Sequence, residues 1–260
     1  MSNERKSTKG TSEKKKQCVK EAKVTNQFKK MMDEALEATK KVLEQRKKDL
    51  SEEGWNDAKR AEFEEIFGIQ GSSIISVDGE DEKKKTKAAD PGSPMDPFIE
   101  IRTISAHEFV QESVERLLAM FEKISTTGNA ENDDPTLNGN FFNKTHLKKG
   151  SASVTADQTS FLDPDRYKEV LKINIFQNFV CKSLMGFDSQ VSTLCHELSH
   201  FYRSGENGKD GGMGTEDMPT KGGYDPNKKY YEFASILKKW KSQYVFKNSY
   251  NVEQYFEIEL

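Results

Sequence analysis

The sequence lacks any apolar run of the roughly 18–20 residues that a helix needs to cross a bilayer, which predicts a protein without a membrane span. Its first residues, 1–20, are polar and rich in lysine and lack the apolar core of a secretory signal, so we expect synthesis in the cytoplasm without a leader. Cysteine is scarce as well. Cys18, Cys181 and Cys195 are too few and too scattered for a disulfide framework, and we expect free thiols in a reducing compartment.

A strong net charge is also missing, because 40 lysines and arginines stand against 43 aspartates and glutamates, a formal net charge of -3. The charge is unevenly distributed: residues 1–50 hold 15 basic and 8 acidic side chains. A basic segment of this kind can bind nucleic acid or an anionic membrane surface. Arginine and aromatic residues, which nucleic-acid sites favour, are few in it. We therefore interpret it as a solubilising tail followed by the solvated face of a helix, and expect no nucleic-acid partner.

The length of 260 residues suits one substantial domain with a tail. Residues 1–20 are rich in lysine, serine, threonine and glutamate, a composition typical of disordered segments. Residues 77–97 are charged and contain proline and glycine, which is typical of a flexible insertion. We therefore predict a disordered basic tail over residues 1–20 and a single domain over residues 21–260 that carries this insertion.

Hydrophobic periodicity predicts a chain that is mostly helical. Ser105 and Glu108 form a capping-box pattern at the start of one helix. Alternation of apolar and polar residues over 171–176 predicts a half-buried strand, and residues 151–158 are a weaker partner strand. The predicted helices cover residues 22–50, 57–67, 106–121, 188–201 and 228–239.

The segment His196-Glu197-Leu198-Ser199-His200 lies in one of these helices and has the pattern HExxH. Two histidines four residues apart project from one helix face, a spacing that suits two neighbouring positions of a tetrahedral metal site. Glu197 follows the first histidine and can take the proton of an attacking water. The competing interpretation is a helix that carries two histidines beside its core stripe by chance. The other histidines, His107 and His146, are expected not to be ligands.

A catalytic zinc needs three protein ligands and one open position, so the chain has to supply a third ligand. The metzincin pattern is excluded because Arg203 and Glu206 stand where it requires glycine and histidine. A glutamate on a later helix is one alternative, and Glu232 is available for it. An aspartate after a glycine-rich turn is another, and residues 211–217 (GGMGTED) offer one. The residues themselves leave this choice open.

The combination of HELSHF over 196–201 with GTED over 214–217 resembles the aspzincins, the family of deuterolysin and the peptidyl-Lys metalloendopeptidases, whose mark is HExxH followed by GTxD. Residues 248–256 (NSYNVEQYF) are similar to the closing N-A-D-x-x-E-Y-F stretch of that family. The resemblance extends from about Ala22 to the C-terminus. It implies an α+β, mostly α, zincin-like metalloprotease fold with a small antiparallel sheet. It also implies one catalytic Zn²⁺ held by His196, His200 and Asp217.

The chain departs from the family pattern around the third ligand. The loop from the second histidine to Asp217 is longer than in the family, so Asp210 and Glu216 stay alternatives as ligands. The family has a tyrosine shortly after the aspartate, which donates a hydrogen bond to the oxyanion. We assign this role to Tyr224. The alternatives, which match the spacing to the closing stretch better, are Tyr230 and Tyr231.

A third departure concerns substrate preference. The lysine-specific members have an aspartate in the N-A-D stretch that receives the substrate lysine, and here Tyr250 or Asn251 stands in its place. Lysine specificity is therefore not expected. Glu253 has two interpretations, a place in the specificity pocket or a hydrogen bond within its helix.

These features predict a zinc-dependent endopeptidase that hydrolyses peptide bonds of protein substrates. The strand over 171–176 is the expected edge along which an extended peptide adds as a further strand. Two settings fit a leaderless chain: an effector or toxin that a specialised secretion system delivers into a target cell, and an intracellular protease. We favour the first, because an unregulated endopeptidase would damage its own cytosol. The alternative function is a catalytically silent binding protein that keeps the zincin fold.

Overall fold

The computed structural model describes residue 22 and residues 25–78, 101–127, 136–148, 150–154, 171–204, 210–218 and 229–260. The predicted tail and nearly all of the predicted insertion lie outside these residues, and the division into tail and domain stays a prediction. Within the described residues the protein is an α+β structure, mostly helical, with small sheets.

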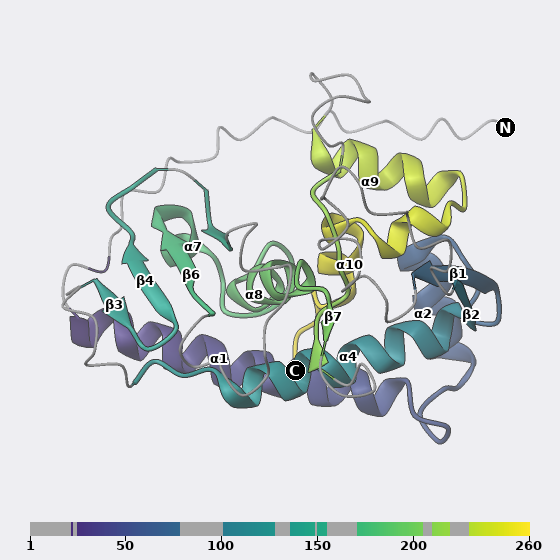
Figure 1. The fold of residues 1–260 in the computed structure, drawn as a ribbon, viewed down its shortest axis with the longest axis horizontal. Coiled ribbons are helices and arrows are strands. Elements are labelled where there is room, and N and C mark those ends of the chain that lie inside the picture. Colours follow the sequence, from purple (N-terminus) through teal and green to yellow (C-terminus); the bar gives the residue numbers. More distant parts are fainter. Residues whose placement is uncertain are drawn as a thin grey trace, which may run out of the picture.

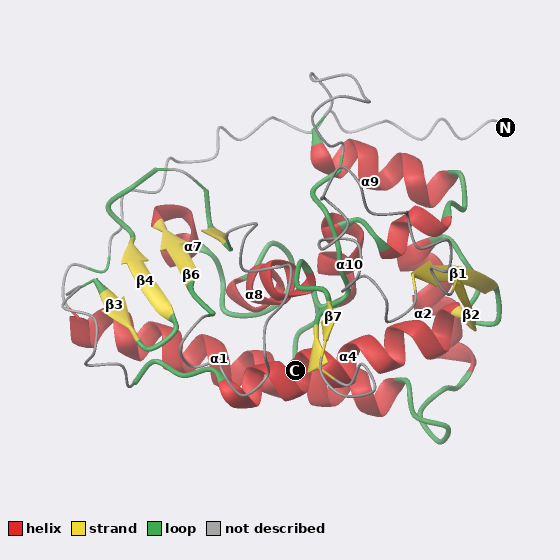
Figure 2. Cartoon of the chain, in the orientation of Figure 1, coloured by secondary structure: helices red, strands yellow, loops and turns green. Residues whose placement is uncertain are grey.

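Helices make up most of the described chain (Figures 1 and 2). The helices are α1 (Thr25–Asp49), α2 (Asp57–Phe67), α4 (Ala106–Lys123), α7 (Gln177–Cys181), α8 (Gln190–Ser199), α9 (Tyr230–Lys239) and α10 (Ser249–Tyr255), with a 3-10 helix η4 (Gln243–Phe246). The strands are β1 (Ile74–Asp78), β2 (Ile101–Ser105), β3 (Leu137–Asn138), β4 (Phe141–Lys144), β5 (Ala152–Ser153), β6 (Ile173–Phe176), β7 (Arg203–Ser204) and β8 (Asp210–Gly211). The five predicted helices are confirmed as α1, α2, α4, α8 and α9.

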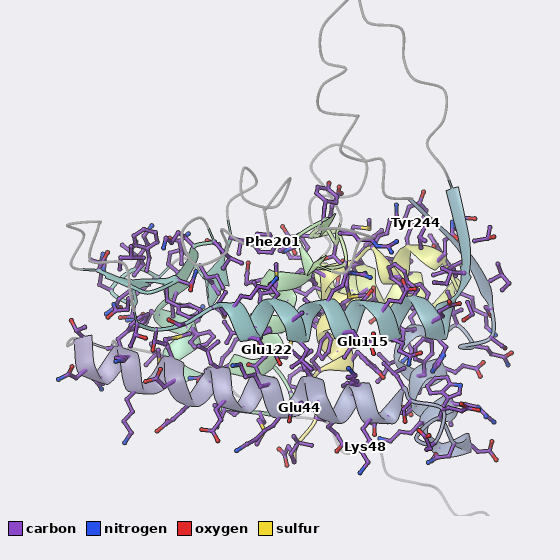
Figure 3. The ribbon with its side chains drawn as sticks, turned by 60° about the horizontal axis from the view of Figure 1, so that its bottom comes forward. Glu44, Lys48, Glu115, Glu122, Phe201 and Tyr244 are labelled. Carbon is purple, nitrogen blue, oxygen red and sulfur yellow. The ribbon has the colours of Figure 1, made fainter. Side chains whose placement is uncertain are left out.

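The two longest helices, α1 and α4, lie side by side and run in opposite directions (Figure 3). Lys47 near the end of α1 pairs with Glu115 in the middle of α4 (3.5 Å). The apolar residues of both helices recur at three- and four-residue spacing, so each helix buries one continuous stripe. Ser105 caps α4 as predicted, because its hydroxyl accepts the backbone N–H of Glu108 (3.1 Å). This helix pair is the base on which the rest of the chain packs.

A four-stranded sheet with the order β3-β4-β6-β5 lies at one end of this base (Figure 1). β6 pairs with β5 in antiparallel and with β4 in parallel orientation, so the predicted antiparallel sheet is wrong in this respect. β6 is an interior strand, and the side chains of Ile173 and Ile175 are fully buried. The prediction that residues 171–176 form the edge strand is therefore also wrong. The edge strand next to β6 is β5, which lies in the weaker predicted segment; among the described residues of that segment, Ala152 and Ser153 pair with β6.

The other end contains the antiparallel β1–β2 hairpin together with α2, α9, η4 and α10 (Figure 1). The almost fully buried side chain of Arg46, near the end of α1, links α1 to α2 and α10. Its guanidinium contacts Asp49 (3.2 Å) and Glu62 (2.8 Å), donates to the Tyr255 carbonyl (2.6 Å) and lies over the Tyr255 ring. A buried charge is tolerated when it is paired in this way. The contacts fix α10 against α1 and α2.

The cysteines differ from their prediction. Cys195 is a free and buried thiol of α8, whereas Cys181 forms a disulfide. The prediction of free thiols is therefore wrong for Cys181, because a scarcity of cysteine excludes a disulfide framework but not a single bond. The cysteines no longer argue for a reducing compartment. Among the described residues, no helix has the length and apolarity needed to cross a membrane.

Candidate active site

Helix α8 lies in the middle of the molecule, between the sheet and α10 (Figure 1). Ser189 caps it, and a reciprocal hydrogen bond with Ser192 completes a capping box (3.1 and 3.0 Å). All ten residues of the helix are buried. Its polar side chains, which include His196 and Glu197, must therefore find partners inside the protein.

The two histidines of the HExxH pattern present the same nitrogen to one point. Their ring centroids lie 5.1 Å apart. The Nδ1 of His200 donates to the Thr215 carbonyl (2.9 Å), and the Nδ1 of His196 donates to the carboxylate of Glu253 (3.0 Å). Because Nδ1 is the donor in both rings, each Nε2 is the nitrogen that could bind a metal ion. Such bonds orient metal-binding histidines in known sites.

Asp217 reaches the histidines because its loop folds back onto the end of α8. The backbone N–H groups of Gly212 and Gly214 donate to the Phe201 carbonyl (3.1 and 2.9 Å), and that of Thr215 donates to the Ser199 carbonyl (3.0 Å). These bonds satisfy carbonyls that the helix end leaves without partners. A Cβ at Gly212 would lie 2.3 Å from the Leu198 carbonyl oxygen, so the close approach requires glycine.

The loop is held from its other side by α10. The backbone N–H of Glu216 donates to the Lys247 carbonyl (2.9 Å), and that of Ser249 donates to the Glu216 carbonyl (3.1 Å). The hydroxyl of Ser249 donates to Oδ1 of Asp217 (2.6 Å). The carboxylate of Asp217 is therefore oriented by a side chain more than thirty residues away, as ligating carboxylates are in metal sites.

His196, His200 and Asp217 form a group that could hold a metal ion. One ligand atom from each residue lies within 4.8 Å of the other two. Oδ1 of Asp217 lies 3.1 Å from Nε2 of His196 and 3.7 Å from Nε2 of His200. The aspartate side chain is 45% exposed, so the group is open to solvent on that side.

The electrostatics of this group favour a positive charge between the rings and the carboxylate. Burial would lower the pKa of His196, but hydrogen bonds to Asp217 and Glu253 outweigh burial and raise it to about 10. Burial would raise the pKa of Asp217, but the hydrogen bond and the charge of His196, with help from Ser249 and His200, lower it to about 2. A field that retains a proton at this point also favours a metal cation, which competes with the proton for the same nitrogen.

Glu197 lies next to this group and does not belong to it. Its Oε2 accepts the backbone N–H of Val154 (3.0 Å), the residue that follows the edge strand β5. Burial raises the pKa of the Glu197 carboxyl above its ordinary value, and the neighbouring His196 and His200 oppose burial only in part. A buried carboxylate with a raised pKa is suited to act as a general base near neutral pH.

The other residues predicted for the site have different positions. Tyr224, predicted to stabilise the oxyanion, lies outside the described residues, and of Asp210 only the backbone is described. Glu232 is exposed on α9, and Glu216 is exposed next to Asp217. Among the described residues, neither glutamate belongs to the group of ligand atoms.

Three further residues contact the predicted ligands in ways that the sequence did not predict. Thr215 orients His200, Ser249 orients Asp217, and the ring of Tyr250 packs edge-on against the ring of His196 (centroids 4.9 Å apart). Ser249, Tyr250 and Glu253 belong to the closing stretch that resembles the aspzincins. That resemblance was the signal that could have placed them at the site.

The remaining histidines have no part in this group. The Nε2 of His107 donates to the Leu50 carbonyl (2.9 Å), and its ring packs against the Trp55 ring (centroids 4.1 Å apart). Because a carbonyl oxygen only accepts, the ring nitrogen is the donor. His146 is exposed.

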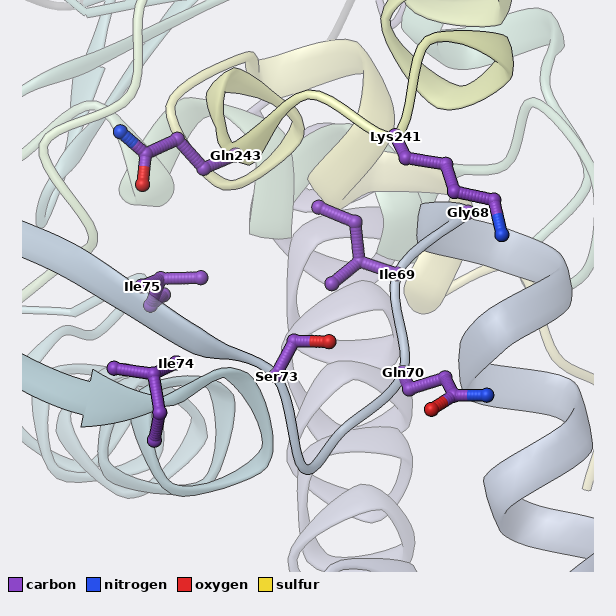
Figure 4. Close-up of a pocket in the computed structure, with 8 residues that line it drawn as sticks. All are labelled: Gly68, Ile69, Gln70, Ser73, Ile74, Ile75, Lys241 and Gln243. Atoms are coloured by element: carbon purple, nitrogen blue, oxygen red, sulfur yellow. The ribbon is translucent and has the colours of Figure 1, made fainter.

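A pocket of about 570 Å³ lies elsewhere, between the β1–β2 hairpin and the turn after α2 (Figure 4). Among the described residues that line it, Lys241 is the only charged one, and none is a histidine or a carboxylate. This pocket therefore lacks the groups that hydrolysis needs. Its lining consists of Gly68, Ile69, Gln70, Ser73, Ile74, Ile75, Lys241 and Gln243.

No protein-family model matches the chain, and no curated protein matches it either. Among solved structures, a zinc peptidase from Grifola frondosa aligns with 88% of this chain and 94% of its own chain, at 15% sequence identity and a TM-score of 0.40. A similarity at this level supports no conclusion about activity. The resemblance to the aspzincins therefore stays a prediction.

Proposed function

We propose that the protein is a zinc-dependent endopeptidase of the zincin type. The observation that carries the proposal is the convergence of His196, His200 and Asp217 with the buried carboxylate of Glu197 beside them. Two imidazoles and one carboxylate are a ligand set that catalytic zinc sites use, with the fourth position open. The hydrogen-bonded Nδ1 atoms and the hydroxyl on Asp217 fit that set, since they leave two nitrogens and a carboxylate oriented toward one point.

In this mechanism Glu197 is the general base. It takes a proton from the attacking water and returns it to the leaving amine, and the Val154 N–H holds its carboxylate in place between these steps. A zinc ion at the three ligands supplies the Lewis acid that brings the pKa of water to about 7 and polarises the peptide carbonyl. We retain Tyr224 as the donor to the oxyanion, with Tyr230 and Tyr231 as alternatives.

The edge strand β5 is the proposed place of the substrate backbone. Val154, which follows it, bonds to Glu197, so a peptide that adds alongside residues 152–153 passes the catalytic base. This assignment replaces the strand over 171–176, which is interior. A protein or peptide substrate is the expected partner, and delivery into a target cell as an effector remains part of the proposal.

Zinc removal tests the proposal. Purified protein should contain one zinc ion per chain and cleave casein, and a chelator should abolish both until zinc is restored. Metal analysis and gel electrophoresis of casein measure the two quantities. Zinc without cleavage of casein or other unfolded proteins would leave a structural metal site and support the catalytically silent alternative. A protein that binds no zinc would contradict the peptidase proposal.

The bond between Glu253 and His196 yields a second prediction. Replacing Glu253 by Gln removes the negative charge that raises the basicity of the His196 ring, so we expect zinc affinity to fall by about 10–100-fold. Competition with a chromophoric chelator measures the affinity. Glu257→Gln is the matched control, because Glu257 accepts a backbone N–H of Asp188 (2.9 Å) rather than a histidine. Equal zinc affinities of the two variants would contradict the role assigned to Glu253.

A further inference from the structure

Three tyrosines gather beside the candidate metal ligands. The ring of Tyr250 packs against His196, stacks on Tyr230 (centroids 4.9 Å apart, planes at 4°) and meets Tyr231 edge-on (5.0 Å). Tyr230 and Tyr231 begin α9 and Tyr250 lies in α10, so two helices bring the rings together. We call Tyr230, Tyr231 and Tyr250 the tyrosine cluster.

The tyrosine cluster is open to solvent next to the site. Tyr230 is 44% and Tyr231 is 39% exposed, although large aromatic side chains gain free energy by burial. Through Tyr250 their exposed rings continue directly to His196. The exposed rings therefore border the face of the site that carries His196.

Three described carboxylates near the tyrosine cluster, those of Glu253, Asp217 and Asp188, have partners already. Glu253 bonds to His196 (3.0 Å) and accepts from the hydroxyl of Ser192 (3.3 Å). Asp217 bonds to Ser249, and Asp188 pairs with Lys182 (2.7 Å). A lysine of the substrate would have to give up its hydration for ring faces alone, whereas an apolar side chain loses little and buries area against them.

We propose, on the basis of the peptidase function above, that the tyrosine cluster forms the substrate subsite beside the metal and selects a large apolar or aromatic side chain next to the scissile bond. The rings supply contact area and favourable aromatic geometry for such a side chain. They supply no carboxylate that pairs with a cation and no basic group that pairs with an acid. The preference is therefore set by α9 and α10, outside the helix that carries the histidines.

Peptides that differ only at the residue next to the scissile bond test the preference. Wild-type protein should cleave a phenylalanine or leucine peptide with a kcat/KM about tenfold or more above that of the matched lysine or aspartate peptide. Tyr250→Ala should lose most of this difference, and Tyr250→Phe should retain it, because the ring stays. A wild type that prefers lysine would show that the rings act as a cation–π site and would overturn the proposal.

A binding measurement separates failure of the subsite from failure of the peptidase function. The hydroxamates of phenylalanine, leucine, lysine and aspartate bind zinc through one end and offer their side chain to the subsite. Calorimetry on the zinc-loaded protein should rank phenylalanine and leucine about tenfold tighter than lysine. If the hydroxamates bind in the expected order but no peptide is cleaved, the peptidase function alone is refuted. If peptides are cleaved but the four hydroxamates bind with equal affinity, the subsite alone is refuted.

Matched variants show whether a loss is specific. Tyr244→Ala removes an exposed tyrosine of η4, which lies beyond the far end of α9, and should leave the ranking unchanged. Zinc content and near-UV circular dichroism show whether Tyr250→Ala keeps its fold. If that variant does not fold, Tyr230→Ala takes its place, because the Tyr230 side chain is largely exposed. An equal loss for all four hydroxamates in a folded variant would contradict the proposal.

Discussion

Replacing Glu197 by Gln should reduce casein hydrolysis by about 10²–10⁴-fold while the protein keeps one zinc ion per chain. The amide of Gln has the size of the carboxylate and can still accept the Val154 N–H, but it cannot take a proton from water. The loss should appear in kcat/KM and in kcat alike, because the base acts on the reacting water. Metal analysis and initial rates on casein check both parts.

Glu216→Gln is the control for this experiment, because Glu216 is an exposed glutamate beside Asp217 and should not affect the rate appreciably. The pH profile adds an independent readout. Only deprotonated Glu197 is a base, and burial raises its pKa above the ordinary 4.5, so the activity should rise with pH through that higher value. An unchanged rate in Glu197→Gln would refute the assigned role, and loss of zinc from it would make Glu197 a ligand.

Replacing Asp217 by Ala should remove zinc from the protein at micromolar concentrations. Loss of a hydrogen bond that supports a ligand lowers metal affinity by about 10–100-fold. Because only three protein ligands hold the proposed ion, loss of a ligand should lower the affinity further. The two remaining histidines then lack the negatively charged carboxylate, whose Oδ1 lies 3.1 Å from Nε2 of His196 in the wild type. Dialysis against a weak chelator followed by metal analysis measures the effect, and casein hydrolysis should disappear with the zinc.

Alanine variants of the other acidic residues are the controls for Asp217. Glu216 and Glu232 are exposed and outside the described group of ligand atoms, so both variants should retain zinc and activity. Asp210→Ala tests the remaining alternative in the long loop. If Asp217→Ala keeps its zinc while one of these variants loses it, the third ligand is the residue that was replaced there.

Local interactions explain why most helices could be predicted from the sequence. The period of apolar residues and the cap at Ser105 act within a few residues of the chain, and α1 and α4 form where these signals stand. The sheet depends on pairing between distant segments, for which alternation alone is a weak guide. The segment over 171–176 reads as a half-buried strand, yet β4 covers its second edge in parallel orientation and turns it into an interior strand.

The HExxH segment illustrates the same division at the site. Helical spacing by itself determined that His196 and His200 share one face and that Glu197 lies beside them, because four residues make about one turn. Which atom of each ring faces the site depended on Thr215 and Glu253, 15 and 57 residues further along the chain. No local pattern encodes these hydrogen bonds.

The sequence alone therefore predicted five of the helices, the histidine pair with its neighbouring base and, through the resemblance to the aspzincins, Asp217 ahead of the other acidic residues for the third position. Only the tertiary structure decided that Asp217 joins the histidines, that β5 is the edge strand, and that the tyrosine cluster borders the site. The physical reason is that each of these depends on long-range contacts. The loop that carries Asp217 folds back because its backbone N–H groups satisfy carbonyls at the end of α8. Ser249 of α10 then holds the Asp217 carboxylate in place.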